Sequence, residues 1–274
     1  MAFFQAKDGT RLFYNDWGRG RPLVLIHGWP VDADMWEYQA SALVEAGFRV
    51  VAYDRRGFGR SEQPWGGYDY DTLADDLAAL IATLDLHQVT LVGFSMGGGE
   101  VARYGSRHGL ARLRSVALIS AVTPFLLETP DNPEGVNASV FLEIAKKLDA
   151  DRPAFLASFA KSFYGASLLK KEPSSELLAW HQRLALLASG RATKACARAF
   201  AETDFRGDLP ALASVPVLII HGNGDETVPI AASARRTRAL LPHATYIEYE
   251  GASHGLFFTE KERLTGDLLS FAQR

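Results

Sequence analysis

The sequence predicts an α/β protein with a mostly parallel central sheet flanked by helices. Short apolar runs alternate with helical patterns along most of the chain, which is typical of strand–helix–strand units. Most of these runs show no polar alternation, as expected for strands that are covered on both faces. The chain has 274 residues and is 47% hydrophobic, enough for one large core with an inserted subdomain.

The predicted strands are short runs rich in β-branched and aliphatic residues. Residues 12–17 alternate apolar and polar side chains, which predicts a half-exposed strand early in the chain. The other strands are predicted at residues 22–26, 49–53, 89–92, 115–120, 217–220 and 245–249. The helices are predicted at residues 35–46, 70–84, 98–108, 230–241 and 260–273.

The alternation of strand and helix fails between residues 122 and 206, where the pattern is helical throughout. Such a stretch is too long for one crossover connection between parallel strands. We therefore expect a helical cap inserted after the strand at residues 115–120, taken as the sixth strand of the fold. The expected division is a first core segment at residues 1–121, the cap at residues 122–206 and a second core segment at residues 207–274.

Composition and charge exclude several classes of partner. The net charge is −3 and no run of lysine or arginine exceeds two residues, so neither nucleic acid nor an anionic membrane surface is expected. No apolar stretch approaches the ~20 residues that span a bilayer, and residues 1–10 do not read as a signal peptide. One cysteine, Cys196, allows no intramolecular disulfide and is expected to be buried and inert. These features predict a cytoplasmic protein.

The strongest catalytic signal is the G-x-S-x-G sequence at residues 93–97. It follows an apolar strand and precedes a helix, the setting that a nucleophile elbow requires. Flanking glycines allow strand and helix to approach closely, and the turn places Ser95 at a helix N-terminus that favours negative charge. Ser95 is therefore the predicted nucleophile, and the N–H of Met96 is one predicted oxyanion donor.

A serine nucleophile needs a base and an orienting acid, which follow it along the chain in this class of site. His254 follows the strand at residues 245–249 and should emerge at the same end of the sheet as Ser95. His243 precedes that strand and is expected to be a solvent-facing turn residue. Asp225 follows the strand at residues 217–220 and is the predicted acid, with the adjacent Glu226 as its close competitor.

Two further motifs follow strands. Residues 27–30, His-Gly-Trp-Pro, lie where the second oxyanion donor is expected, and Trp29 can supply its N–H whereas Pro30 has none. His27 is expected to fix this loop by hydrogen bonding. Residues 54–61 lack a phosphate-binding pattern and are expected to form a structural turn. No cluster has metal-ligand spacing, so neither a metal nor another cofactor is expected.

Together with residues 222–225 and 253–255, these motifs resemble the cofactor-free haloperoxidase (perhydrolase) and aryl-esterase branch of the α/β-hydrolase superfamily. The resemblance covers nearly the whole chain. It implies the α/β-hydrolase fold, a Ser-Asp-His triad without metal or haem, and a homo-oligomer. Members of the branch act as esterases, perhydrolases and lactamases, and they halogenate indirectly through a peracid made from an organic acid and hydrogen peroxide.

We therefore expect a serine hydrolase that cleaves small to medium carboxylic esters through an acyl-enzyme, with perhydrolase activity towards a carboxylic acid and hydrogen peroxide. Pro30 either orients the preceding carbonyl towards a bound peroxide or merely stiffens the turn. An apolar pocket is expected to bind the substrate. Its predicted lining residues are Trp29, Pro30, Phe125, Phe159, Phe163 and Val228.

Other functions remain open on the same motifs. A lactamase, a lactonase or a hydroxynitrile lyase could use the same triad, whereas haloalkane dehalogenases and epoxide hydrolases need an aspartate where this chain has Ser95. A non-catalytic small-molecule-binding protein on the same fold is the alternative from a different class. Labelling of Ser95 by a fluorophosphonate distinguishes an enzyme from such a protein.

Overall fold

The computed structural model describes residues 2–165 and 173–274. Within them lies one eight-stranded sheet, with strand order β1-β2-β4-β3-β5-β6-β7-β8. The first two strands pair antiparallel with their neighbours, and all other neighbouring strands are parallel. The strands are β1 (Ala2–Gln5), β2 (Arg11–Gly18), β3 (Pro22–Ile26), β4 (Arg49–Tyr53), β5 (Val89–Phe94), β6 (Leu113–Ile119), β7 (Val217–Gly222) and β8 (Thr245–Tyr249).

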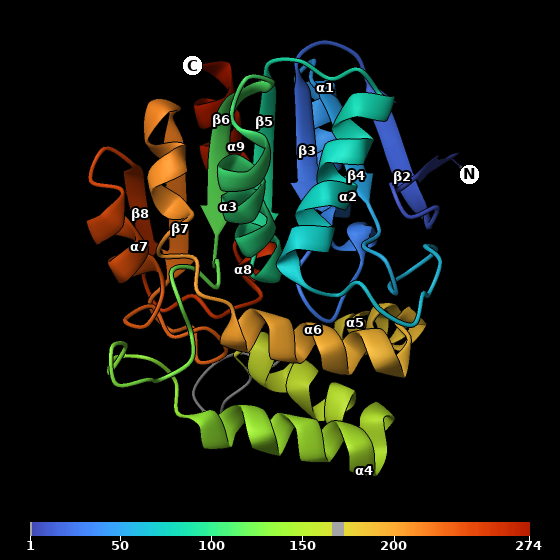
Figure 1. The fold of residues 1–274 in the computed structure, drawn as a ribbon, viewed down its shortest axis with the longest axis vertical. Coiled ribbons are helices and arrows are strands. Elements are labelled where there is room, and N and C mark those ends of the chain that lie inside the picture. Colours follow the sequence, from blue (N-terminus) through green and yellow to red (C-terminus); the bar gives the residue numbers. More distant parts are fainter. Residues whose placement is uncertain (1, 166–172) are drawn as a thin grey trace.

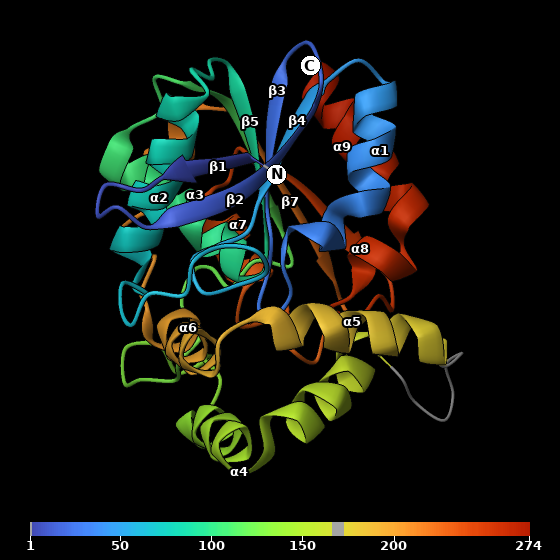
Figure 2. The ribbon, with the colours of Figure 1, turned by 90° about the vertical axis from the view of Figure 1, so that its right-hand side faces the viewer.

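Helices cover both faces of this sheet, as Figures 1 and 2 show. One face carries α2 (Tyr70–Thr83), α3 (Met96–His108) and α7 (Ala234–Leu240). The other carries α1 (Glu37–Glu45), α8 (Leu256–Thr259) and α9 (Lys261–Gln273). Successive strand residues point to opposite faces, so Val24 and Leu25 of β3 belong to two different buried clusters. Covering on both faces explains why the central strands are mostly apolar and buried.

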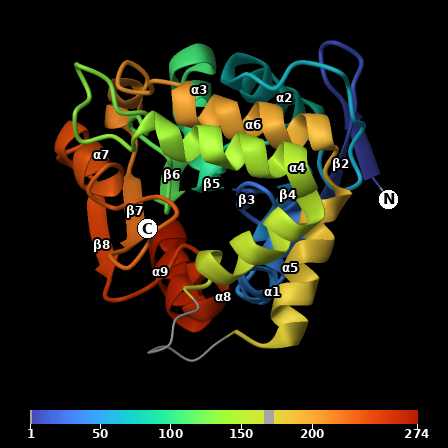
Figure 3. The same ribbon diagram turned by 90° about the horizontal axis from the view of Figure 1, so that it is seen from below.

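The remaining helices form the cap. They are α4 (Ala138–Phe163), α5 (Ser175–Leu187) and α6 (Gly190–Glu202), which lie beyond the carboxyl ends of the parallel strands in Figures 1 and 3. The helix α4 is bent where Asp151 has non-helical dihedrals and Pro153 begins a new turn. Short 3₁₀ segments, η1 (Ala33–Trp36) and η2 (Leu209–Ser214), complete the elements. No helix of the described residues is long and apolar enough to cross a membrane.

The predicted fold class, including the cap after the sixth strand, is confirmed, but three local predictions are wrong. The edge strand β1 was not predicted; its Phe3 and Phe4 pair with β2. Residues 122–137 are not helical, because prolines interrupt them and the Asn132 amide donates to the carbonyl of Phe125. The helix predicted from residue 230 begins at Ala234. The exact domain limits at 122 and 206 stay a prediction.

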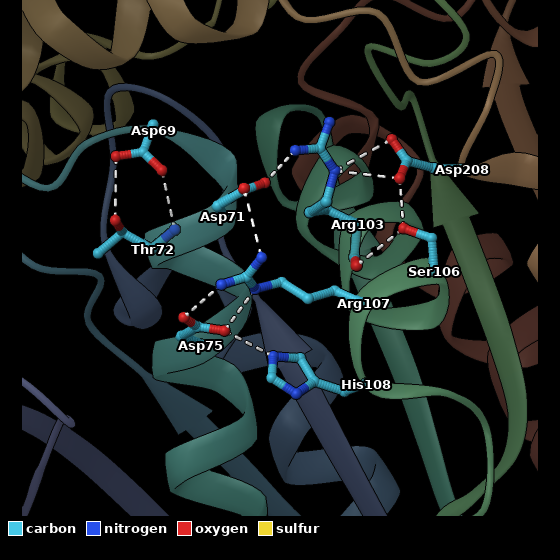
Figure 4. Close-up of polar contacts among 9 residues, drawn as sticks. All are labelled: Asp69, Asp71, Thr72, Asp75, Arg103, Ser106, Arg107, His108 and Asp208. Carbon is cyan, nitrogen blue, oxygen red and sulfur yellow. Dashed lines mark hydrogen bonds and ion pairs between the residues drawn. The ribbon is translucent and has the colours of Figure 1, made fainter.

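A network of ion pairs fixes α3, the helix that begins beside Ser95, against its neighbours (Figure 4). Arg103 of α3 contacts Asp71 of α2 and also donates to Asp208, 3.0 Å away, just before η2. One turn further on, Arg107 donates to Asp75 of α2 at 2.7 Å. These pairs are partly exposed, so each contributes little singly, but together they fix the orientation of α3 on the sheet.

Candidate active site

Ser95 lies on a sharp turn between β5 and α3, with dihedrals of φ 54° and ψ −118°. This left-handed φ is strained for a non-glycine residue, and such strain is common where a side chain must be presented for chemistry. The turn is bonded to the neighbouring strand, because the N–H of Ser95 donates to the carbonyl of Ile119 in β6 at 2.8 Å. Gly93 is required, since a Cβ there would lie 2.4 Å from the carbonyl oxygen of Gly97. The serine hydroxyl is thus held at the carboxyl end of the sheet.

His254 and Asp225 meet Ser95 at this edge from two other loops. The Nε2 atom of His254 lies 3.0 Å from the Ser95 hydroxyl, and its Nδ1 atom lies 2.6 Å from Asp225 Oδ2. His254 follows β8, and Asp225 follows β7. The imidazole of His254 is 1% exposed and packs between the rings of Phe94 and Phe163. The three side chains therefore form a continuous hydrogen-bonded line.

The surroundings of Asp225 keep it ionised. Its Oδ1 accepts from the backbone N–H groups of Thr227 and Val228 at 2.9 and 2.8 Å. Burial alone would raise the pKa of Asp225, but the charge of His254 and hydrogen bonds from His221 and His254 lower it well below its usual range. His221 was not predicted as a site residue from the sequence, yet its Nε2 lies 3.2 Å from Asp225 Oδ2. Its position four residues before Asp225, at the end of the same strand, was the available signal.

Buried Arg55, which follows β4, links the loop after β3 to the start of α3. Arg55 Nη2 donates to the carbonyl of His27 at 2.7 Å, and its guanidinium also bonds Glu100 of α3. The backbone N–H of Arg55 donates to His27 Nε2 at 3.0 Å, and burial lowers the pKa of His27 well below its usual value. The expected structural role of His27 agrees with these bonds. They join the loop that carries Trp29 to the helix that begins at Met96.

Trp29 also links this loop to the cap. Its indole N–H donates to the carbonyl of Thr193 in α6 at 2.9 Å. Its ring lies edge-on to two phenylalanine rings of the cap. The ring centroid of Trp29 is 5.2 Å from that of Phe159 in α4 and 5.7 Å from that of Phe200 in α6. Pro30 is buried in the same loop and is joined to Trp29 by a cis peptide bond. The backbone N–H of Met96 belongs to the first turn of α3, where no carbonyl within the helix can accept it.

A cavity of about 430 Å³ opens between Ser95 and the cap. Most of its lining is apolar or aromatic, and the polar exceptions other than Ser95 are Ser162, Thr227 and Glu226. The full lining is Trp29, Ser95, Val122, Leu126, Val136, Val140, Phe141, Ile144, Phe159, Ser162, Phe200, Glu226, Thr227, Val228 and Pro229. An apolar ester of modest size fits such a site.

Half of the predicted pocket residues line this cavity, namely Trp29, Phe159 and Val228. The others do not belong to its lining. Phe163 is fully buried against His254, and Phe125 is buried beneath the guanidinium of Arg206. Pro30 is buried. The contribution of the first half of α4 to the lining was not predicted, because a helical pattern does not reveal which face meets the sheet.

Other predicted residues lie as follows. Glu226 is exposed and forms no hydrogen bond with His254, while His243 is exposed at the opposite end of β8. Cys196 is buried in α6, and burial raises the pKa of its thiol to about 12, so it is inert. Asp54 accepts from the N–H groups of Ala33 and Arg60, as the structural interpretation of its turn requires. No group of three or more metal-binding side chains occurs among the residues that the structure covers.

The chain belongs to the α/β-hydrolase family, whose model matches residues 21–261. It is 42% identical to a non-heme chloroperoxidase of Kitasatospora aureofaciens, with both chains covered completely. It is also 38% identical to a bifunctional esterase/perhydrolase of Acinetobacter calcoaceticus, with 99% of each chain covered. The expected family is therefore confirmed.

Solved structures show the same likeness in three dimensions. The crystal structure of a bromoperoxidase from Bacillus anthracis is 43% identical and superposes with a TM-score of 0.96, covering 100% of this chain and 99% of that one. An esterase from Exiguobacterium antarcticum is 34% identical, with a TM-score of 0.94 over 100% of this chain and 99% of that one. Both likenesses extend through the cap as well as the core.

Proposed function

We propose that this protein is a serine hydrolase that cleaves small to medium carboxylic esters through an acyl-enzyme. The observation that carries the proposal is the continuous line of Ser95, His254 and Asp225 at 3.0 and 2.6 Å, open to an apolar cavity. The esterase and esterase/perhydrolase names among its relatives support the same reaction.

In the proposed mechanism, Ser95 attacks the ester carbonyl while His254 Nε2 accepts the hydroxyl proton. Asp225 fixes the ring of His254 and stabilises the imidazolium that forms. The N–H groups of Trp29 and Met96 donate to the oxyanion, and the buried Arg55–Glu100 pair holds their two segments together. His254 then protonates the leaving alcohol, and water cleaves the acyl-enzyme.

Perhydrolysis is proposed as a second reaction of the same acyl-enzyme. A carboxylic acid acylates Ser95 and releases water, and hydrogen peroxide then attacks the acyl carbon. His254 accepts a peroxide proton and returns it to Ser95, so that a peracid leaves and no cofactor is consumed. The haloperoxidase names of several relatives favour this reaction, and Pro30, next to the proposed oxyanion donor Trp29, is its proposed determinant.

The test is a series of p-nitrophenyl esters of increasing chain length, assayed with and without peroxide. Ser95→Ala should lower kcat by about 10⁴-fold or more while the fold is retained. A fluorophosphonate should label wild-type Ser95, as shown by mass spectrometry of the modified peptide. A contamination-free Ser95→Ala preparation that keeps more than a few per cent of the activity would refute the assignment, and an inert wild-type Ser95 would support a binding protein instead.

Assembly and cellular location are further proposals. We propose a homo-oligomer, supported by the resemblance to the haloperoxidase branch, and light scattering after size-exclusion chromatography tests it. A cytoplasmic location is supported by the single buried cysteine, Cys196, which offers no disulfide. Fractionation of cells that express the full chain tests that proposal.

A further inference from the structure

Glu226 has an unusual position for a charged residue at this site. It follows Asp225 in the loop after β7, where Asp225 Oδ1 accepts from the N–H groups of Thr227 and Val228. This turn directs Asp225 inward to His254 and leaves Glu226 exposed. Glu226 nevertheless lines the same cavity as the Ser95 hydroxyl. One loop therefore supplies two carboxylates. That of Asp225 bonds His254, and that of Glu226 belongs to the lining of the cavity.

Within the part of the chain that the structure describes, no neighbour neutralises the charge of Glu226. It is the one charged side chain in the cavity lining, and it forms no ion pair or side-chain hydrogen bond with any residue that the structure describes. The rest of the lining is mostly aromatic or aliphatic, and it includes the paired rings of Trp29 and Phe159. Apolar walls of low dielectric constant concentrate the field of a lone charge into the cavity rather than screening it.

We propose that Glu226 selects substrates by charge, favouring esters that carry a cationic group over esters that carry an anionic one. This inference rests on the proposed esterase activity and adds a substrate class to it. A cation near Glu226 gains Coulomb attraction and can also lie against the electron-rich faces of the aromatic walls. An anion at the same place is repelled by the Glu226 carboxylate, so nothing offsets the cost of removing its water in an apolar cavity.

The experiment compares three butyrate esters of similar size and different permanent charge. They are butyrylcholine, which is cationic, 3,3-dimethylbutyl butyrate, which is neutral, and 2-sulfoethyl butyrate, which is anionic. Alkali uptake at constant pH gives kcat/KM for each ester with the wild-type protein and with Glu226→Gln. Because every rate is compared with that of the neutral ester, changes common to all three cancel.

At a separation of ~8 Å and an effective dielectric constant of ~40, one charge changes kcat/KM by about fivefold. Glu226→Gln should therefore lower the ratio of cationic to anionic ester by about 25-fold, and Glu226→Lys should reverse the preference. The wild-type preference should weaken in 0.5 M salt, where the Debye length is about 4 Å. A role of Glu226 confined to packing or folding does not produce this salt dependence.

The matched control is Glu262→Gln, which removes the same charge from α9, a helix that contributes no residue to the cavity. Its charge ratio should equal that of the wild type. Active Glu226 variants with an unchanged ratio would overturn the inference while leaving the esterase proposal intact. A wild-type protein that hydrolyses p-nitrophenyl butyrate but none of the three esters would overturn the inference alone, and one that hydrolyses none of the four would overturn both.

Discussion

His181 offers a quantitative test of how the cap is packed against the site. It lies on α5, is completely buried, and its Nδ1 atom lies 3.2 Å from the Tyr164 hydroxyl. Its ring packs on Phe163, which in turn packs on His254. Burial, together with the charge that His254 carries when protonated, lowers the pKa of His181 to about 3. His181 is therefore uncharged in the folded protein at ordinary pH.

The sign of the effect on stability follows from proton linkage. An unfolded histidine has a pKa of about 6.5, so between pH 6.5 and about pH 3 the unfolded chain binds a proton at His181 that the folded protein does not. The contribution of His181 to stability is fully present above pH 6.5 and decreases as the pH falls. Between pH 7.0 and pH 5.5 the loss is about 1.2 kcal/mol.

The assay is urea unfolding of wild type and His181→Gln at both pH values, where glutamine is neutral and keeps a hydrogen-bonding side chain. The other titrating groups cancel in the difference between the two proteins. The destabilisation caused by His181→Gln should therefore be about 1.2 kcal/mol smaller at pH 5.5 than at pH 7.0. His243→Gln is the matched control, since this exposed imidazole stays in water in both states. If the destabilisation caused by His181→Gln is the same at both pH values, the conclusion that His181 is buried and neutral in the folded protein is wrong.

Three further predictions address the proposed chemistry. Asp225→Asn should lower kcat towards p-nitrophenyl esters by orders of magnitude, and far more than Glu226→Gln, because only Asp225 reaches His254 Nδ1. The reverse order would make Glu226 the acid. Activity should survive exhaustive dialysis against chelators, and a loss restored by one metal ion would contradict the mechanism. Pro30→Leu should reduce peracid formation from a short-chain acid much more than ester hydrolysis, with both rates measured on one preparation; equal proportional losses would leave Pro30 a structural residue.

The central architecture could be predicted because buried parallel strands have a strong sequence signature. The strands at 22–26 and 245–249 have the predicted limits, since each is bounded by turn-forming residues. Ser95, Asp225 and His254 could be placed at one edge because the carboxyl ends of parallel strands must coincide there. Strand topology thus converts three distant positions in the sequence into neighbours.

The lining of the cavity could not be predicted in the same way. Phe159 and Phe163 are four residues apart on α4, yet Phe159 lines the cavity whereas Phe163 packs on His254. Their roles depend on the bend near Asp151 and on how α4 is rotated over the sheet. These are results of tertiary packing that helical periodicity does not contain. The charge at Glu226 was visible in the sequence, but its place in the cavity was not.

The indole of Trp29 has a consequence for how such enzymes can be redesigned. The indole N–H of Trp29 donates to the Thr193 carbonyl, so this hydrogen bond connects the cap directly to the loop beside the nucleophile. The start of α6 is also bonded to the core, where Ser189 N–H donates to the Gly57 carbonyl at 2.9 Å. Exchange of the cap for that of another protein is therefore expected to lower the catalytic rate as well as to change the substrate selectivity. A graft that retains residues 189–193 keeps these attachments, whereas a graft joined at the outer ends of the cap removes them.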